Sequence, residues 1–89
     1  MNAFSITFRN GTKLYEAEVV KYFSEPIRYE VFNVIPYNWN LPTRFAFISN
    51  AVLDQLVYQS FNEHNRELLT NIGEAIFKTC QLLKIPVHH

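Results

Sequence analysis

The Asn10-Gly11 pair constrains the fold most, because it lies between two segments that alternate polar and apolar residues, 4–8 and 13–19. Asparagine and glycine both adopt positive φ at low cost. Between alternating segments, this pair is typical of a two-residue β-hairpin turn of type I′. The sequence therefore predicts an antiparallel hairpin at the start of the chain.

The pairing expected for this hairpin gathers its apolar side chains on one face. With Arg9 and Thr12 flanking the turn, Ile6 is expected opposite Tyr15. Successive side chains of a strand point to opposite faces, so one face is apolar and the other is polar. The apolar face holds Phe4, Ile6, Phe8, Tyr15, Ala17 and Val19, and the polar face holds Ser5, Thr7, Glu16 and Glu18.

A second turn is indicated at residues 24–26, Ser-Glu-Pro, because proline fixes φ and has no N–H to give to a strand ladder. A three-residue loop there places Val19 opposite Val31. The same ladder brings Tyr15 opposite Ile35, so the face that the first hairpin buries stays apolar. Two separate turns that bury one face support each other, since a one-residue slip would reverse every side chain.

The middle of the chain predicts a loop and further strands. Residues 36–42 are bounded by two prolines and contain two asparagines, which indicates a loop, and residues 43–48 alternate as a fourth strand does. Residues 52–61 fit either a short helix or a fifth strand. The strand is favoured because Val57 and Tyr58 prefer extended structure and because a fifth strand would cover an open edge.

The C-terminal part predicts one amphipathic helix over residues 63–83, where apolar residues recur every three or four positions. Gly73 inside this helix costs about 1 kcal/mol relative to alanine, so we hypothesise that a backbone or a bulky aromatic of the sheet approaches it closely. Candidate N-terminal caps are Ser60, in a capping box with Glu63, and Asn62 or Asn65. The apolar stripe comprises Leu68, Leu69, Ile72, Ala75, Ile76, Cys80 and Leu83.

These elements together predict a single α+β domain over residues 1–89. Its two layers are an antiparallel meander of four to five strands and one C-terminal helix packed on one face. The length of 89 residues, of which 48% are hydrophobic, suits one small core.

Charge and cysteine content narrow the expected partners and the expected compartment. Eight basic and eight acidic side chains give a formal charge of zero, without the basic excess that favours nucleic acid or anionic membranes. The single Cys80 cannot form a disulfide within the chain, and residues 1–23 alternate instead of forming a secretory signal. No apolar run approaches the ~20 residues that span a bilayer. We therefore expect a cytoplasmic protein that binds neither nucleic acid nor membrane.

The face opposite the predicted core is more apolar than a solvated face needs to be. One helix covers only one face, so a second copy, another partner or residues 52–61 as a helix would cover the other. Scattered surface apolar residues are the alternative interpretation. The function expected from this face is that of a small non-enzymatic module that associates with other proteins, most simply as a homodimer. The expected contact residues are Val20, Tyr22, Phe32 and Val34, with Leu14 and Ile48 on the same face.

The predicted loop at 36–42 holds Tyr37 and Trp39, the sole tryptophan. A lone tryptophan in a small domain is more typically a lid on the core, with its indole N–H near water. Loops also carry function, and tryptophan is favoured at binding hot spots. The second hypothesis is therefore a small-molecule or peptide binder that uses Tyr37 and Trp39.

No recognised catalytic pattern is present. Cys80 falls on the apolar stripe, where a buried and unreactive thiol is the ordinary outcome, and neither His64 nor Asp54 lies in a known motif. The closing His88-His89 pair suggests no role by itself. Without CxxC or HExxH spacing, a metal site is not expected. We expect no catalytic residue, no metal and no cofactor.

Overall fold

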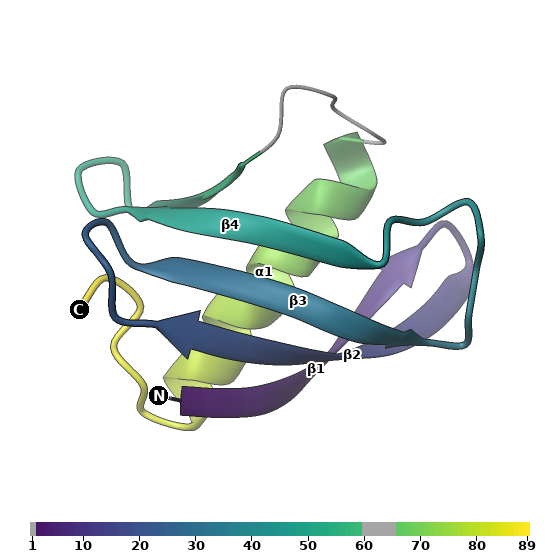
Figure 1. Ribbon diagram of the computed structural model, residues 1–89, viewed down its shortest axis with the longest axis horizontal. Coiled ribbons are helices and arrows are strands. Elements are labelled where there is room, and N and C mark those ends of the chain that lie inside the picture. Colours follow the sequence, from purple (N-terminus) through teal and green to yellow (C-terminus); the bar gives the residue numbers. More distant parts are fainter. Residues whose placement is uncertain (1, 60–65) are drawn as a thin grey trace.

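The strands form one antiparallel sheet in which their order in space is their order in the chain, as in a meander (Figure 1). The computed structural model describes residues 2–59 and 66–89. Helix α1 crosses behind the curled sheet, on one face (Figure 1), so the predicted two-layer α+β architecture is confirmed. The elements are β1 (Asn2–Asn10), β2 (Lys13–Tyr22), β3 (Arg28–Ile35), β4 (Arg44–Asn50), β5 (Gln55–Tyr58) and α1 (Arg66–Leu82).

The core lies between α1 and the predicted apolar face of the sheet. Leu83 was expected in the helix stripe but is largely exposed, because α1 ends at Leu82 and the helical spacing ends with it. The strands contribute Phe4, Ile6, Phe8, Tyr15, Ala17, Val19, Tyr29, Val31, Phe45 and Phe47, and the helix contributes Leu68, Leu69, Ile72, Ile76 and Cys80.

The first hairpin forms, but its register differs from the predicted one. Asn10 pairs with Lys13, so the two-residue loop is Gly11-Thr12, and Ile6 faces Ala17 instead of Tyr15. Gly11 has a φ of 65° at the first central position, where type II′ turns place glycine. This shift of two residues keeps every side chain on its face, which is why the buried set is as predicted although the pairs are not.

The ladder between β2 and β3 contains a bulge. Val19 has its predicted partner, but nearer the end of β3 the register slips. Phe32 faces Glu18 whereas Ile35 faces Glu16, so three steps along β3 match two steps along β2. The extra residue in β3 turns the rest of this strand over.

The bulge overturns two predictions. Asn33 has a φ of 52°, the left-handed conformation that the bulge requires. Beyond it, Val34 packs against the core, and its predicted place on the opposite face is wrong. Ile35 was predicted in the core but is 62% exposed.

The remaining predictions concern the fifth strand and the helix. Strand β5 confirms the strand over the helix alternative for this segment. A Cβ added at Gly73 would lie 3.8 Å from Phe47, an ordinary van der Waals distance, so the aromatic is present but does not require glycine. The predicted caps Ser60, Asn62, Glu63 and Asn65, and also His64, lie outside the described residues.

Candidate interaction surfaces

The face of the sheet away from α1, which we call the open face, is nearest the viewer in Figure 1. Its aromatic side chains are partly covered by arginines of neighbouring strands. The Arg28 guanidinium lies 4.9 Å from the Tyr22 ring centroid, and that of Arg44 lies 5.4 Å from the Phe32 ring centroid. Each pair joins directly opposed residues of adjacent strands. These cation–π contacts explain how both rings are partly buried although no helix or strand among the described residues covers this face.

Charge on the open face is balanced. Arg44 Nη1 lies 3.4 Å from Glu30 Oε2, and Asn33 Nδ2 donates to Glu18 Oε2 at 2.7 Å. Arg28 Nε is buried and has no acceptor among the described residues. The open face therefore presents both positive and negative charges. Its charged residues are Arg9, Arg28 and Arg44 with Glu16, Glu18 and Glu30.

The loop between β3 and β4 presents its aromatic residues to solvent. Tyr37 and Trp39 are each 79% exposed, so the interpretation of Trp39 as a lid on the core is wrong. Val34 and Leu41 pack against the core at this end of the sheet, whereas the indole does not.

Asn38 fixes this loop by three hydrogen bonds. Its main-chain oxygen accepts from the Leu41 amide at 2.9 Å, and its Oδ1 accepts from the Asn40 amide at 2.9 Å. Its Nδ2 donates to the hydroxyl of the core residue Tyr15 at 3.0 Å. The backbone that carries the exposed rings of Tyr37 and Trp39 is therefore held to the core through Asn38.

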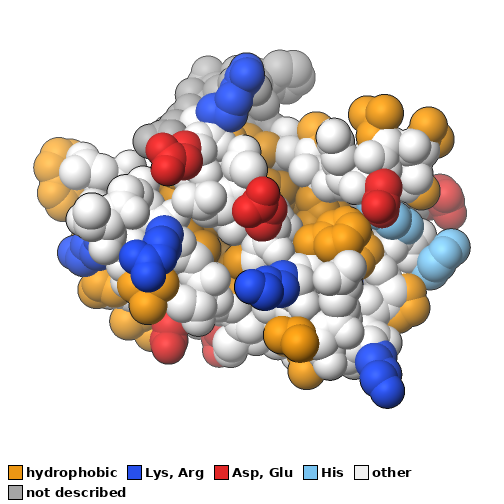
Figure 2. All heavy atoms as spheres, turned by 180° about the vertical axis from the view of Figure 1, so that it is seen from behind, with side chains coloured by type: hydrophobic (Ala, Val, Ile, Leu, Met, Phe, Trp, Pro, Cys, Tyr) orange, Lys and Arg blue, Asp and Glu red, His pale blue; other side chains and the backbone are white. Residues whose placement is uncertain are grey.

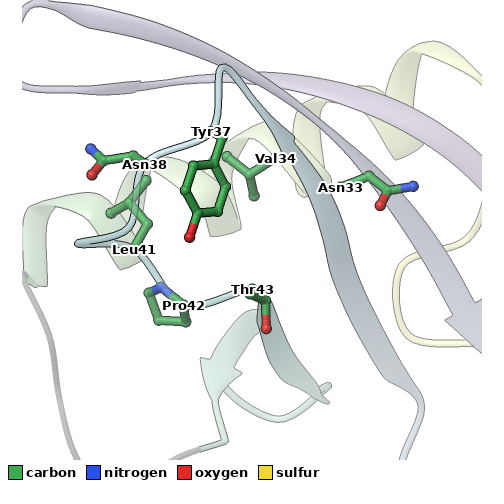
Figure 3. A pocket seen from close by; sticks show the side chains of 7 residues that line it. All are labelled: Asn33, Val34, Tyr37, Asn38, Leu41, Pro42 and Thr43. Atoms are coloured by element: carbon green, nitrogen blue, oxygen red, sulfur yellow. The ribbon is translucent and has the colours of Figure 1, made fainter.

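A pocket of about 220 Å³ lies beside this loop, and Figure 3 shows its lining residues. The Tyr37 ring points toward Pro42 and Thr43, whereas Asn33 points away from them (Figure 3). A second hollow of about 440 Å³ shares Asn33 and Val34 with it. The first pocket is lined by Asn33, Val34, Tyr37, Asn38, Leu41, Pro42 and Thr43, and Glu16, Glu18 and Ile35 are among the residues that line the second.

Lys21 is a candidate that the sequence predictions omit, although it is the charged residue in the apolar set of β2. Its side chain is fully buried on the core side of the sheet. Its Nζ donates to the main-chain oxygens of Pro86 and His89 and lies 4.9 Å from the Phe23 ring centroid. Burial lowers the pKa of Lys21, and the nearby Cys80 partly opposes this shift.

Tyr29 and Cys80 lie beside this lysine. The Tyr29 hydroxyl donates to the Val87 main-chain oxygen at 2.7 Å. Burial raises the pKa of Tyr29 well above its ordinary value. Burial also raises the pKa of the Cys80 thiol, although a hydrogen bond with Tyr29 and the charge of Lys21 oppose the shift. Cys80 therefore stays a neutral thiol at neutral pH, as a structural cysteine does.

Three more polar residues meet at the same end of the molecule. His88 Nδ1 lies 3.0 Å from Ser49 Oγ, and His88 Nε2 lies 2.7 Å from Asp54 Oδ1. No motif surrounds Asp54 in the sequence, and the sequence did not single out Ser49 or His88 for a catalytic role. Because 34 and 39 residues separate His88 from its two partners, only the fold brings them together.

The described residues form no metal centre, and comparisons with known proteins give no further information about these surfaces. Within residues 2–59 and 66–89, no three histidine, cysteine, aspartate or glutamate side chains are placed to hold a metal ion. In the same part of the chain, no helix has both the length and the apolar character needed to cross a membrane. No protein-family model, no curated protein and no solved structure matches this chain.

Proposed function

We propose that this protein is a small module that acts by associating with a second copy of itself through the open face. The observation that carries the proposal is the pairing of apolar rings with balanced charge on this face. Val20, Tyr22 and Phe32 supply apolar area, and Ile35 takes the place expected for Val34.

Balanced charge favours a second copy over a partner of one charge sign. In a two-fold dimer the same patch meets itself, so arginines of one copy face glutamates of the other if the axis passes between them.

The size of the open face suits a stable dimer. The molecule measures 32 by 27 Å along its two longer axes, and Figure 1 looks onto the sheet along the shortest one. A face of these dimensions is comparable with the roughly 800 Å² per partner that standard interfaces bury. The open face with its flanking loops therefore has the area that such an interface buries.

Light scattering after size exclusion, over a range of concentrations, tests this proposal. We expect a dimer whose fraction rises with concentration and falls with added salt, because part of the contact is ionic. Phe32→Glu places a charge at the centre of the face and should give a monomer. Leu82→Glu, at an exposed position at the end of α1, is the matched control and should leave the dimer intact. A wild-type protein that stays monomeric at high micromolar concentration would rule the proposal out.

A second candidate function is peptide binding by the loop at 36–42, and the exposure of Tyr37 and Trp39 favours it. Exposed aromatic residues on a fixed backbone are typical binding anchors, since little conformational entropy is lost on contact. The adjacent pocket of about 220 Å³ is smaller than the roughly 300–1,000 Å³ of drug-sized ligand sites. It suits one side chain of a peptide better than a whole small molecule.

Selection from a displayed library of short peptides tests this second function. We expect the enriched peptides to bind wild-type protein and the Phe32→Glu variant equally, and to lose affinity for Trp39→Ala. Peptides that bind Trp39→Ala as well as wild type would assign recognition to another surface.

A further inference from the structure

A serine, a histidine and an aspartate form a continuous hydrogen-bonded chain near the C-terminal end of the molecule, away from the loop at 36–42 (Figure 1). When His88 Nε2 donates to the Asp54 carboxylate, His88 Nδ1 keeps a lone pair and accepts from the Ser49 hydroxyl. Nucleophile, base and orienting carboxylate occur in this order in hydrolases of unrelated folds. In the usual triad the histidine Nε2 faces the serine and Nδ1 faces the aspartate. Here Nδ1 faces Ser49 and Nε2 faces Asp54.

The chain of three residues is held by the surrounding structure. The Ser49 amide donates to the Ile27 main-chain oxygen at 2.9 Å, and this hydrogen bond holds Ser49 in place near the end of β4. The His88 side chain is 14% exposed and meets the Phe77 ring edge-on at 6.2 Å. Lys21 and Tyr29 bind main-chain oxygens on both sides of His88. The imidazole is therefore positioned before any ligand arrives, as a catalytic base must be.

A hollow of about 520 Å³ gives access to Ser49 and His88, which both line it. Figure 2 shows the molecule from the side of α1, with the two histidines at one end of the surface. Asp54 is exposed at the outer end of the hydrogen-bonded chain. The apolar part of the wall is formed by Phe23, Pro26, Ile27 and Ala51. Ser24, Glu25 and His89 complete the lining, and its apolar part suits the acyl group of a small ester.

We propose that Ser49 is the nucleophile of an acyl-transfer site that accepts small apolar esters. Ser49 Oγ attacks the ester carbonyl carbon, and its proton passes to His88 Nδ1. The bond to the leaving alcohol breaks, and the alcohol departs with that proton. Water, activated by the same nitrogen, then releases the acid and restores the serine. This inference goes beyond self-association, uses another surface and departs from the expectation of a module without catalysis.

The same contacts also fasten the C-terminal segment to the sheet, so the test must separate a reactive serine from a structural one. An alkyl fluorophosphonate does so, because it reacts with activated serines whatever their natural substrate. The bond from Ser49 Oγ to phosphorus forms, the bond from phosphorus to fluorine breaks, and the serine proton leaves with fluoride. We expect one adduct per chain, located at Ser49 by peptide mass spectrometry.

Variants decide whether His88 activates the serine. His88→Gln should slow labelling about 100-fold, as the loss of a general base does. Ser5→Ala is the matched control, because Ser5 is an exposed serine on the open face, outside this hollow. It should be labelled at the wild-type rate.

Asp54→Asn gives a second measurement at an exposed position, where the amide oxygen can still accept from His88 Nε2, and should slow labelling at least about 10-fold. No adduct at Ser49 in the folded protein would overturn the proposal. Equal labelling rates in wild type and in the His88 and Asp54 variants would overturn it too, because the serine would then react without its partners.

Discussion

Asn33 Nδ2 donates to Glu18 Oε2 at 2.7 Å, across the place where β3 carries its extra residue. The backbone of Asn33 is in the left-handed conformation, and this hydrogen bond ties its side chain to the strand opposite. This position decides which of the next two residues faces the core. In the structure Val34 does, and Ile35 is left on the open face.

Replacing Asn33 by valine should destabilise the protein by about 1–2 kcal/mol, because a β-branched side chain is strained at a φ of 52°. Urea unfolding measures the difference. Asn33→Gly removes the same hydrogen bond without the strain and should cost less. Glu18→Gln keeps an acceptor and should stay within about 0.5 kcal/mol of wild type. An equal loss in the valine and glycine variants would mean that the hydrogen bond matters, and not the backbone.

The two glycines should respond to alanine in opposite directions. Gly73→Ala should stabilise the protein by about 1 kcal/mol, because the new methyl would meet Phe47 at an ordinary 3.8 Å and alanine favours helix. Gly11→Ala should destabilise it by about 1 kcal/mol or more, since Gly11 has a φ of 65°. Chemical denaturation of both variants beside wild type checks the signs. A loss of stability in Gly73→Ala would show that the helix cannot accommodate the methyl group.

Much of this fold could be predicted from local signals. Alternation along β1 and β2 identified the buried face, and the three-to-four spacing of residues such as Ile72 and Ile76 identified the helix. The hairpin register was missed by two residues, since the same face is buried either way and hydrophobic alternation cannot distinguish the two registers.

The bulge at Asn33 was not predictable by alternation, because alternation assumes equal steps on both strands. Trp39 was misplaced because no local signal shows which residues near this loop reach the core. Val34 and Leu41 pack against it, and the indole does not. Lys21 was visible in the sequence as a charged residue within an apolar set. Its acceptors at Pro86 and His89 come from the far end of the chain, where no local pattern points to them.

The exposure of Trp39 makes it a reporter of binding. As the sole tryptophan, at 79% exposure, it should fluoresce like indole in water and be quenched freely by acrylamide. Trp39→Ala should change the free energy of unfolding by no more than about 0.5 kcal/mol, as exposed substitutions do. A blue-shifted spectrum protected from acrylamide at low protein concentration would contradict the observed loop.

Lys21 should make stability depend on pH in a direction that can be worked out. Burial lowers its pKa in the folded protein below the ordinary value of 10.5, whereas the unfolded chain keeps that value. Between the two values the unfolded state binds more protons, so the contribution of Lys21 to the free energy of unfolding rises with pH toward 10.5.

Lys21→Met keeps most of the buried volume and removes the titrating group. Subtracting its free energy of unfolding from that of wild type should give a difference that rises as pH increases toward 10.5. Tyr29 also titrates over part of this range but is present in both proteins. Cys80 titrates there too, and Lys21→Met removes the charge that opposes the shift of its pKa, so both proteins carry Cys80→Ala. Urea unfolding at a series of pH values provides the measurement. A flat or falling difference would mean that the folded protein does not penalise the charge on Lys21, and that the main-chain oxygens of Pro86 and His89 fully replace its water.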